Sequence, residues 1–380
     1  MNDSGAGQTL RVGFDDQIFQ AQLRGGISKY FVELVERLPQ FGIEPVVLST
    51  STRNLHLAES GLVPRAPEPG RLAARTAWAS WRLFGRPRTT PRPMPQLDVM
   101  HHTFTHGSYL RSWSGPSVVT MFDMTPELFP SYFKLGNPHF AKRRYCDECD
   151  AIISISQNTA DDMYRLYGDA MRDRTTVIPF GVGEEFLEPG PAPAGLPERY
   201  VLFVGVRTGY KDFPTAVEAY ARVAADDPDL ALVVVGGGAF TSEELDALAA
   251  AGVADRVTKL QPSDAEMPET YRRAAVFLFP SLYEGFGLPT LESLAAGTPT
   301  ILADASCSRE VGGDAALYFE PANRDQLVDR IREALSPSAS EDAQLRGPAR
   351  AREFGWDRVA QMTADLYRSL APPHATHQGD

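Results

Sequence analysis

The stretch "PSLYEGFGLPTLESLAAGTP", residues 280–299, holds two glutamates, three glycines and three prolines between apolar segments. The apolar run "VFLF" directly before it predicts a buried strand. Pro289 suits the first turn of a helix, and Gly297 suits the position just past a helix end. The pattern therefore predicts a strand, a tight loop and the N-terminus of a helix.

The loop has the composition of a phosphate site. Gly285 and Gly287 allow a sharp turn and a close approach of the backbone to a ligand. The amide groups around Phe286, Gly287 and Leu288 would then lie at the positive end of the helix, where phosphate binds well.

Two carboxylates accompany this loop. Glu284 and Glu292 would repel a phosphate, but a carboxylate accepts two hydrogen bonds from a vicinal diol such as a ribose or another sugar. Phosphate, ribose and sugar together describe a nucleotide sugar.

Outward from this stretch, short apolar runs alternate with helical periodicity along the chain, which is typical of parallel βαβ units. We expect two doubly wound α/β domains with parallel sheets. The expected strands are residues 10–14, 45–49, 98–102, 116–122, 151–156 and 175–180, then 200–205, 230–236, 257–260, 276–279, 300–304 and 316–319.

The 380-residue length also favours two domains. Residues 184–199 hold four prolines and two glycines, as a linker would. This linker separates a first domain, residues 1–183, from a second, residues 200–355, and a helix is expected at residues 356–371.

An insertion at residues 66–96 fits neither half, because it carries six arginines, two tryptophans and a single acid. Such a mixture of tryptophan and arginine is expected at anionic lipid surfaces. A solvated loop near the acceptor site is the other interpretation.

Charge and composition exclude several classes of protein. A formal net charge of -12 argues against wholesale binding of nucleic acid. No apolar run reaches the length of a membrane span, and the first residues lack the features of a signal peptide. We expect a cytoplasmic protein that can contact the inner membrane face peripherally.

Neither the cysteines nor the histidines predict a metal site. Cys146 and Cys149 form a CxxC pair without a second pair to complete a zinc site, so we expect helix residues. His101, His102 and His106 lie close together but lack further ligands nearby. No metal and no cofactor are expected.

The sequence resembles a known family. Glu284 and Glu292, separated by seven residues in "EGFGLPTLE", resemble the signature of retaining glycosyltransferases of family 4, which have the GT-B fold of two facing Rossmann-like domains. Other matching segments are "GGISKYFVEL", "AIISISQNTADDM", "VIPFGVGEEF", "VGVRTGYKDFPTAVEAY" and "SREVGGDAALYFEP". The resemblance covers nearly the whole chain except the arginine-rich insertion.

The resemblance implies roles for the residues of the second domain. Glu284 would contact hydroxyls of the donor sugar, and Glu292 the ribose. Arg207 and Lys211 would neutralise the leaving diphosphate, although Arg207 lies one residue later than in the commonest pattern.

For the first domain, the resemblance implies that Gly25 and Gly26 approach the β-phosphate at a helix N-terminus. It also implies that the helix at residues 356–371 crosses back onto this domain. The sugar would be transferred with retention by front-face attack, without a dedicated base.

One position departs from the family. Many members carry a histidine followed by aspartate where this chain has Phe122 and Asp123, and that histidine faces the donor sugar near its 6-hydroxyl. Either His102 or His106 replaces the missing polar contact, or the donor lacks a 6-hydroxyl.

The combined expectation is an enzyme that transfers a hexose from a nucleoside-diphosphate sugar to a hydroxyl of a glycan, lipid-linked or small-molecule acceptor. The closest resemblance is to bacterial O-antigen mannosyltransferases, which implies GDP-mannose. The alternatives are a UDP-hexose (glucose or N-acetylglucosamine) transferase, a non-catalytic binder of nucleotide sugars, and a glycoside hydrolase that uses Glu284 and Glu292 as its carboxylate pair.

Overall fold

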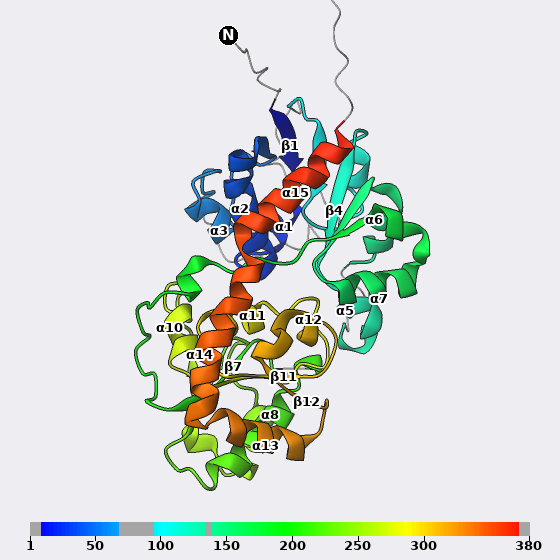
Figure 1. The fold of residues 1–380 in the computed structure, drawn as a ribbon. Helices are drawn as coiled ribbons and strands as arrows, with labels where there is room; N and C mark the ends of the chain where they lie inside the picture. The colour runs from blue at the N-terminus through cyan, green and yellow to red at the C-terminus, as the bar shows by residue number, and fades with distance from the viewer. Residues whose placement is uncertain (1–8, 68–94, 134–138, 208, 372–380) are drawn as a thin grey trace, which may run out of the picture. The chain divides into compact units, whose positions relative to one another are not determined.

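The computed structural model describes residues 9–67, 95–133, 139–207 and 209–371. The chain divides into two compact units (Figure 1). The first unit consists of Met1–Ile155, Thr159–Gly181 and Trp356–Asp380. The second consists of Ser156–Asn158 and Val182–Gly355. Each unit is an α/β fold around its own parallel sheet, as the sequence predicts.

The first unit contains a six-stranded sheet in the order β2-β1-β3-β4-β5-β6, and every neighbouring pair of strands is parallel. Its strands are β1 (Leu10–Phe14), β2 (Ile43–Val47), β3 (Val99–His102), β4 (Ser117–Met121), β5 (Ala151–Ser154) and β6 (Thr175–Val177). β3 and β4 are buried along their whole length, as expected for parallel strands covered on both faces.

The α-helices of the first unit include the C-terminal one. They are α1 (Gln17–Ala21), α2 (Gly26–Arg37), α3 (Leu55–Glu59), α5 (Thr125–Leu128), α6 (Lys142–Glu148), α7 (Gln157–Tyr167) and α15 (Trp356–Leu370). α15 packs along α2, and Figure 1 shows the two helices side by side. Its buried residues include Trp356, whose ring lies 5.7 Å from that of Tyr30 on α2.

The second unit contains another six-stranded parallel sheet, in the order β12-β11-β10-β7-β8-β9. Its strands are β7 (Tyr200–Val204), β8 (Ala231–Val235), β9 (Val257–Leu260), β10 (Val276–Phe279), β11 (Thr300–Ala303) and β12 (Leu317–Phe319). Its helices are α8 (Phe213–Ala224), α9 (Ser242–Ala250), α10 (Met267–Arg272), α11 (Leu288–Ala295), α12 (Ser308–Gly312), α13 (Arg324–Ala334) and α14 (Pro337–Ala351).

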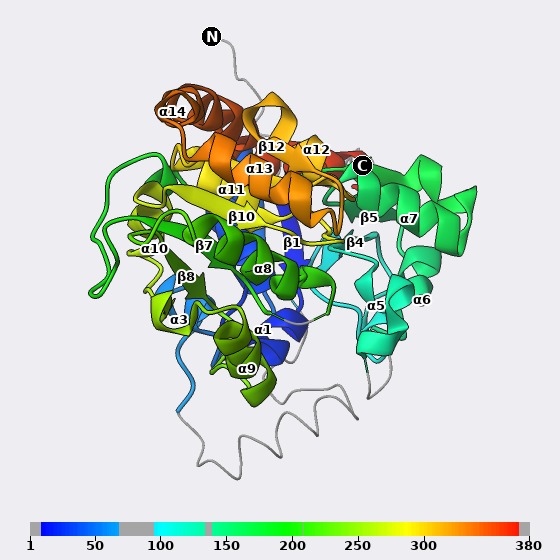
Figure 2. The same cartoon turned by 90° about the horizontal axis from the view of Figure 1, so that it is seen from below.

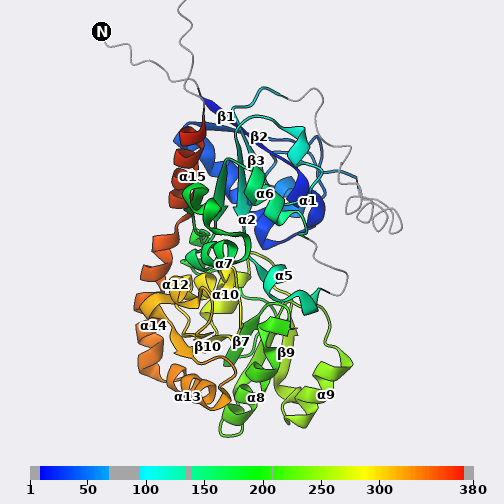
Figure 3. The same cartoon turned by 90° about the vertical axis from the view of Figure 1, so that its right-hand side faces the viewer.

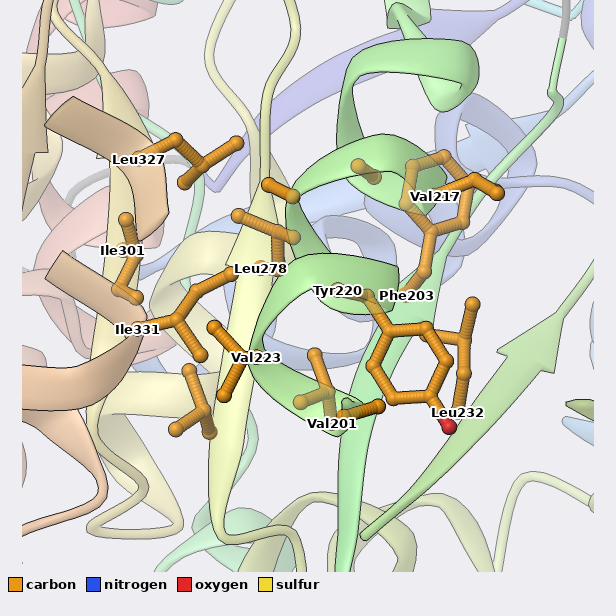
Figure 4. Close-up of a cluster of buried hydrophobic side chains, with 14 of the residues drawn as sticks. Val201, Phe203, Val217, Tyr220, Val223, Leu232, Leu278, Ile301, Leu327 and Ile331 are labelled. Carbon is orange, nitrogen blue, oxygen red and sulfur yellow. The ribbon is translucent and has the colours of Figure 1, made fainter. Parts of the chain in front are cut away.

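One face of the second sheet packs against α8 and α13, which contact each other (Figures 2 and 3). Figure 4 shows the resulting core, in which Val217, Tyr220 and Val223 of α8 face side chains of the strands. Leu327 and Ile331 extend this core from α13.

The proline-rich stretch expected as a linker, residues 184–199, belongs to the second unit. It contains a short 3-10 helix, η5 (Glu184–Phe186), in which Phe186 is buried. The guanidinium of Arg272 donates to the carbonyl oxygens of Phe186 (2.9 Å) and Glu188 (2.8 Å). Phe186 and the two contacts of Arg272 anchor the first residues of this stretch, whereas most of residues 187–199 are exposed.

The strand orders decide where a ligand can bind. In an open parallel sheet, ligands bind at the carboxyl ends of the strands where the strand order reverses. This switch point lies between β1 and β3 in the first sheet and between β7 and β10 in the second. Within the described parts of the chain, no helix is both long and apolar enough to cross a bilayer.

Candidate functional site

The loop after β10 has the predicted geometry. β10 ends at Phe279, and α11 begins at Leu288 after Gly287, whose φ of 83° is left-handed. Only glycine adopts such a conformation without strain. Gly297 follows the helix with a φ of 73°. Strand, tight loop and helix N-terminus are confirmed, with the loop at the carboxyl end of a switch-point strand.

The backbone of Glu284 is held on both sides by the turn after β11. Its amide donates to Ser306 Oγ (3.0 Å), and its carbonyl oxygen accepts from Cys307 Sγ (3.3 Å). Ser306 has a φ of 46°, a conformation that costs a serine conformational energy. This turn therefore fixes the position from which the Glu284 side chain extends.

That side chain meets Lys211. Lys211 Nζ lies 2.5 Å from Glu284 Oε1, and both side chains are partly buried. Lys211 ends the short 3-10 helix η6 (Gly209–Lys211) after β7, and its ammonium group lies 5.3 Å from the ring centroid of Phe279. The two loops of the switch point thus bring one cation and one carboxylate together.

Glu292 lies one turn into α11. Its Oε2 accepts a hydrogen bond of 2.8 Å from the hydroxyl of Tyr271, a fully buried residue of α10. Burial, and then the charge of Glu292, raises the pKa of Tyr271 well above its ordinary value. The hydroxyl therefore stays protonated and is a constant donor to Glu292.

Arg207 is placed differently from Lys211. Its Nε donates to Glu244 (2.9 Å), and its terminal nitrogens donate to the carbonyl oxygens of Gly236 (2.8 Å) and Ala239 (2.9 Å). Its side chain is 2% exposed. Arg207 therefore stabilises the loop between β8 and α9, whereas Lys211 is the cation that lies beside Glu284.

The two helices that follow the switch-point strands begin without a side-chain cap. This holds for α8, after Asp212, and for α11, after Gly287. Among the other helices of this unit, α10 and α12 also lack a side-chain cap, whereas α9, α13 and α14 are capped by Thr241, Asn323 and Ser336. Backbone amides at a helix start carry partial positive charge and suit an anion such as phosphate.

In the first unit, the predicted glycine turn is shaped by a neighbouring side chain. A Cβ on Gly25 would lie 2.4 Å from Gln22 Oε1, whereas a Cβ on Gly26 would meet nothing within 4 Å. The same oxygen accepts from the amide of Ser28 in the first turn of α2 (3.2 Å). Gly25 thus leaves room for the end of the Gln22 side chain, a contact that the sequence did not suggest.

The two histidines proposed to replace the family histidine differ in exposure. His102 is 2% exposed, and its Nδ1 lies 2.8 Å from Asp15 Oδ2. His106 is partly exposed, and its Nδ1 lies 2.9 Å from Ser108 Oγ. Of the two, His106 is the one that reaches the surface of this unit.

Phe122 belongs to an aromatic cluster. Its ring lies 5.4 Å from Tyr30, 5.9 Å from Phe31 and 5.8 Å from Phe180. The carboxylate of the following Asp123 accepts from the amide of Thr125 (3.1 Å). Phe122 therefore stabilises the first unit through ring contacts, which a histidine could make only at a cost in desolvation.

Comparison with known proteins agrees with this geometry. A family model described as Glycosyltransferase Family 4 matches residues 24–186, and one described as Glycosyl transferases group 1 matches residues 191–352. The chain belongs to the glycosyltransferases of the GT-B type.

Two relatives illustrate the range of this group. The glycosyltransferase is 25% identical to O-antigen chain mannosyltransferase B of Escherichia coli, over 91% of this chain and 96% of that protein. It is 28% identical to D-inositol 3-phosphate glycosyltransferase of Nocardiopsis dassonvillei, over 92% and 91%.

Solved structures share the fold. Anabaena HepE in complex with UDP and glucose has a TM-score of 0.71 at 17% identity, covering 95% of this chain and 100% of that one. Sucrose-phosphate synthase from Thermosynechococcus elongatus has a TM-score of 0.66 at 20% identity, covering 95% and 99%.

The two cysteines of the CxxC pair are buried in the first unit. Cys146 and Cys149 are buried free thiols, and burial raises the pKa of each to about 12. Cys146 lies in α6, as expected, and Cys149 follows its end. Over the described ranges, no three histidine, cysteine or carboxylate side chains are grouped as metal ligands. The arginine-rich insertion lies almost wholly outside the described residues.

Sequence reasoning missed the residues that hold the site. Tyr271, Ser306 and Cys307 look like an ordinary core aromatic and two small turn residues. Periodicity carries no signal for a hydrogen bond between two helices, so only the fold reveals these contacts.

Proposed function

We propose that this glycosyltransferase moves a hexose, with mannose as the best candidate, from a nucleoside-diphosphate sugar to an acceptor hydroxyl. The observation that carries the proposal is the 2.5 Å pair between Lys211 and Glu284 at the switch point of the second sheet. A cation for a diphosphate and a carboxylate for sugar hydroxyls are the two groups that this reaction needs in one place. The family assignment removes the glycoside hydrolase alternative.

Lys211 would stabilise the negative charge that develops on the leaving diphosphate. The starts of α8 and α11, which lack side-chain caps, would add partial positive charge at the carboxyl edge of the sheet, which both helix starts share. Without substrate, Lys211 and Glu284 compensate each other's charge. With substrate, phosphate oxygens would take over the ammonium and sugar hydroxyls the carboxylate, so neither charge is left unpaired.

The remaining roles follow the same logic. Glu292 would accept hydrogen bonds from the ribose, and the amides of residues 285–288 would face the sugar and phosphate. Transfer with retention needs no dedicated base, because the leaving phosphate can accept the proton of the acceptor. Since Lys211 and the helix starts supply positive charge, we propose that the reaction needs no metal ion.

GDP-mannose is the favoured donor. It follows from the resemblance to O-antigen mannosyltransferases and from the E. coli relative, which carries that name and aligns over 91% of this chain. A UDP-hexose is the alternative, because the structure of HepE contains UDP and glucose and has the same fold. The acceptor would be a glycan, a lipid-linked sugar or a small molecule. Peripheral membrane contact through residues 66–96 remains part of the proposal.

The test is a donor screen. Thermal shift and donor hydrolysis are measured with GDP-mannose, GDP-glucose, UDP-glucose and UDP-N-acetylglucosamine, each with and without EDTA. We expect the largest shift and the fastest hydrolysis with GDP-mannose, unchanged by EDTA. Faster hydrolysis of a UDP-sugar would move the assignment to the alternative donor. Strong binding of a donor without turnover on any acceptor would indicate a non-catalytic binder.

A further inference from the structure

The hydroxyl of Tyr271 donates a hydrogen bond to Oε2 of Glu292. The tyrosine comes from α10 and the glutamate from α11, so the contact joins two helices on one side of the sheet. Its length of 2.8 Å is that of a good hydrogen bond from a hydroxyl to a carboxylate.

The tyrosine itself is held firmly. Its ring packs edge-on against Phe277 of β10 (5.4 Å) and Phe186 of η5 (6.0 Å). Its carbonyl oxygen accepts from the hydroxyl of Thr298 (2.7 Å). Tyr271 is 0% exposed, so water does not compete for its hydroxyl.

The orientation of the Glu292 carboxylate depends on the rotamer of its side chain. A glutamate side chain has three rotatable bonds, and a partly exposed one samples several rotamers. A hydrogen bond from a rigid, buried donor selects one orientation of the carboxylate plane. The side chain of Glu292 then loses its conformational entropy on folding and not on binding. Binding is therefore stronger for a ligand group that this orientation suits.

We infer that Tyr271 is a positioning residue that orients Glu292 toward the ribose diol and so sets the preference for ribonucleotides over deoxyribonucleotides. The inference rests on the proposed function, because it takes Glu292 to be the ribose ligand. The segment η5 takes part in this arrangement, since the buried ring of Phe186 packs edge-on against the ring of Tyr271.

The experiment measures Kd by calorimetry for GDP and UDP and for their 2′-deoxy and 3′-deoxy analogues. A lost hydrogen bond to a charged group should make the deoxy analogues bind about tenfold or more weakly than the ribonucleotide in the wild type. In Tyr271→Phe we expect this discrimination to fall to about threefold, while the affinity for the deoxy analogues changes little.

The matched control is Tyr220→Phe. Tyr220 is also fully buried in the second unit, and its hydroxyl donates to the carbonyl oxygen of Leu230 (2.8 Å), far from Glu292 in the sequence and on α8. It should lose stability without losing discrimination. A merely structural role of Tyr271 would make the two variants behave alike.

A double mutant separates the remaining outcomes. In a Glu292→Ala background, Tyr271→Phe should have no further effect on discrimination, because the tyrosine acts through the carboxylate. Two results would overturn the inference. One is an unchanged discrimination between ribonucleotide and deoxyribonucleotide in Tyr271→Phe. The other is that Tyr271→Phe lowers this discrimination as much in the Glu292→Ala background as in the wild type. If the wild type binds neither GDP nor UDP, the proposed function itself fails, and this result is distinct from either of those.

Discussion

A carboxylate lies in a loop at each of the two switch points, and the two carboxylates differ in their burial and in their hydrogen-bond partners. In the first unit, Asp15 follows β1, is 4% exposed and accepts five hydrogen bonds, from Gln17, His102 and Thr103. In the second unit, Glu284 follows β10, is 16% exposed at its side chain and has Lys211 as its ion-pair partner.

The difference separates a structural carboxylate from the one that we propose to bind the donor sugar. The oxygens of Asp15 are saturated by the loops after β1 and β3, so the residue joins those loops and has little left to offer a ligand. The carboxylate of Glu284 is paired with the ammonium group of Lys211, a cation that a phosphate can attract. We therefore propose that the switch-point loops of the two sheets serve different purposes.

The largest expected effect tests the structural side of this comparison. Asp15→Ala should lower the free energy of unfolding by about 3 kcal/mol, because it leaves several buried donors without an acceptor. Urea denaturation measures this, with Glu284→Ala as the control, for which we expect a change below about 1 kcal/mol. Equal losses in the two variants would contradict the distinction.

The next effect tests the binding side. Lys211→Ala should lower kcat/KM for the donor about 100-fold, or about 2.7 kcal/mol, because the charge on the leaving diphosphate is no longer stabilised. Its melting temperature should change little. Arg207→Ala is the control. We expect this variant to have a lower melting temperature, because it loses the contacts of Arg207 with the loop between β8 and α9. Wild-type turnover in Lys211→Ala would refute the assignment.

The pH dependence of the free energy of unfolding tests the effect of a buried histidine in the first unit. Burial, and then the charge of His102, lowers the pKa of His101 to about 3 in the first unit, against the opposing effect of Asp15. Below about pH 6.5, His101 binds a proton in the unfolded chain but not in the folded chain. Its contribution to the free energy of unfolding is therefore fully present above about pH 6.5 and is lost as the pH falls toward 3.

From this group alone we expect a loss of about 2 kcal/mol between neutral pH and pH 5. His139, with a pKa lowered by burial to about 4, acts in the same direction. Denaturation at pH 7, 6 and 5 measures the loss, and His101→Gln should flatten the dependence. If that variant keeps the wild-type slope, His101 is not the group responsible.

The smallest expected effect concerns the donor sugar. Phe122 cannot bond a 6-hydroxyl, and His106 is the more exposed of the two histidines that could do so. We expect GDP-mannose to be used at least as well as the 6-deoxy donor GDP-rhamnose. His106→Ala should lower kcat/KM for GDP-mannose about tenfold and leave GDP-rhamnose nearly unchanged. A tenfold preference of the wild type for GDP-rhamnose would make Phe122 the specificity residue.

The sequence by itself determined the two parallel sheets and most strand positions, since β9 and β10 begin and end at the predicted residues. It also determined the loop and helix start at residues 284–288, because apolar runs, glycine and proline act through local backbone preferences. The glutamates and Lys211 were identified as candidates for the same reason: their chemistry can be recognised without knowing their neighbours.

Only the tertiary structure decided which candidates meet. It brought Lys211 to ion-pair distance from Glu284 and placed the Arg207 guanidinium against the loop between β8 and α9. It also placed the hydroxyl of Tyr271 within hydrogen-bond distance of Glu292. Each of these contacts joins residues more than 20 positions apart, brought together by the strand order and not by local preference. A hydrogen bond depends on distance and direction in three dimensions, and a one-dimensional pattern records neither.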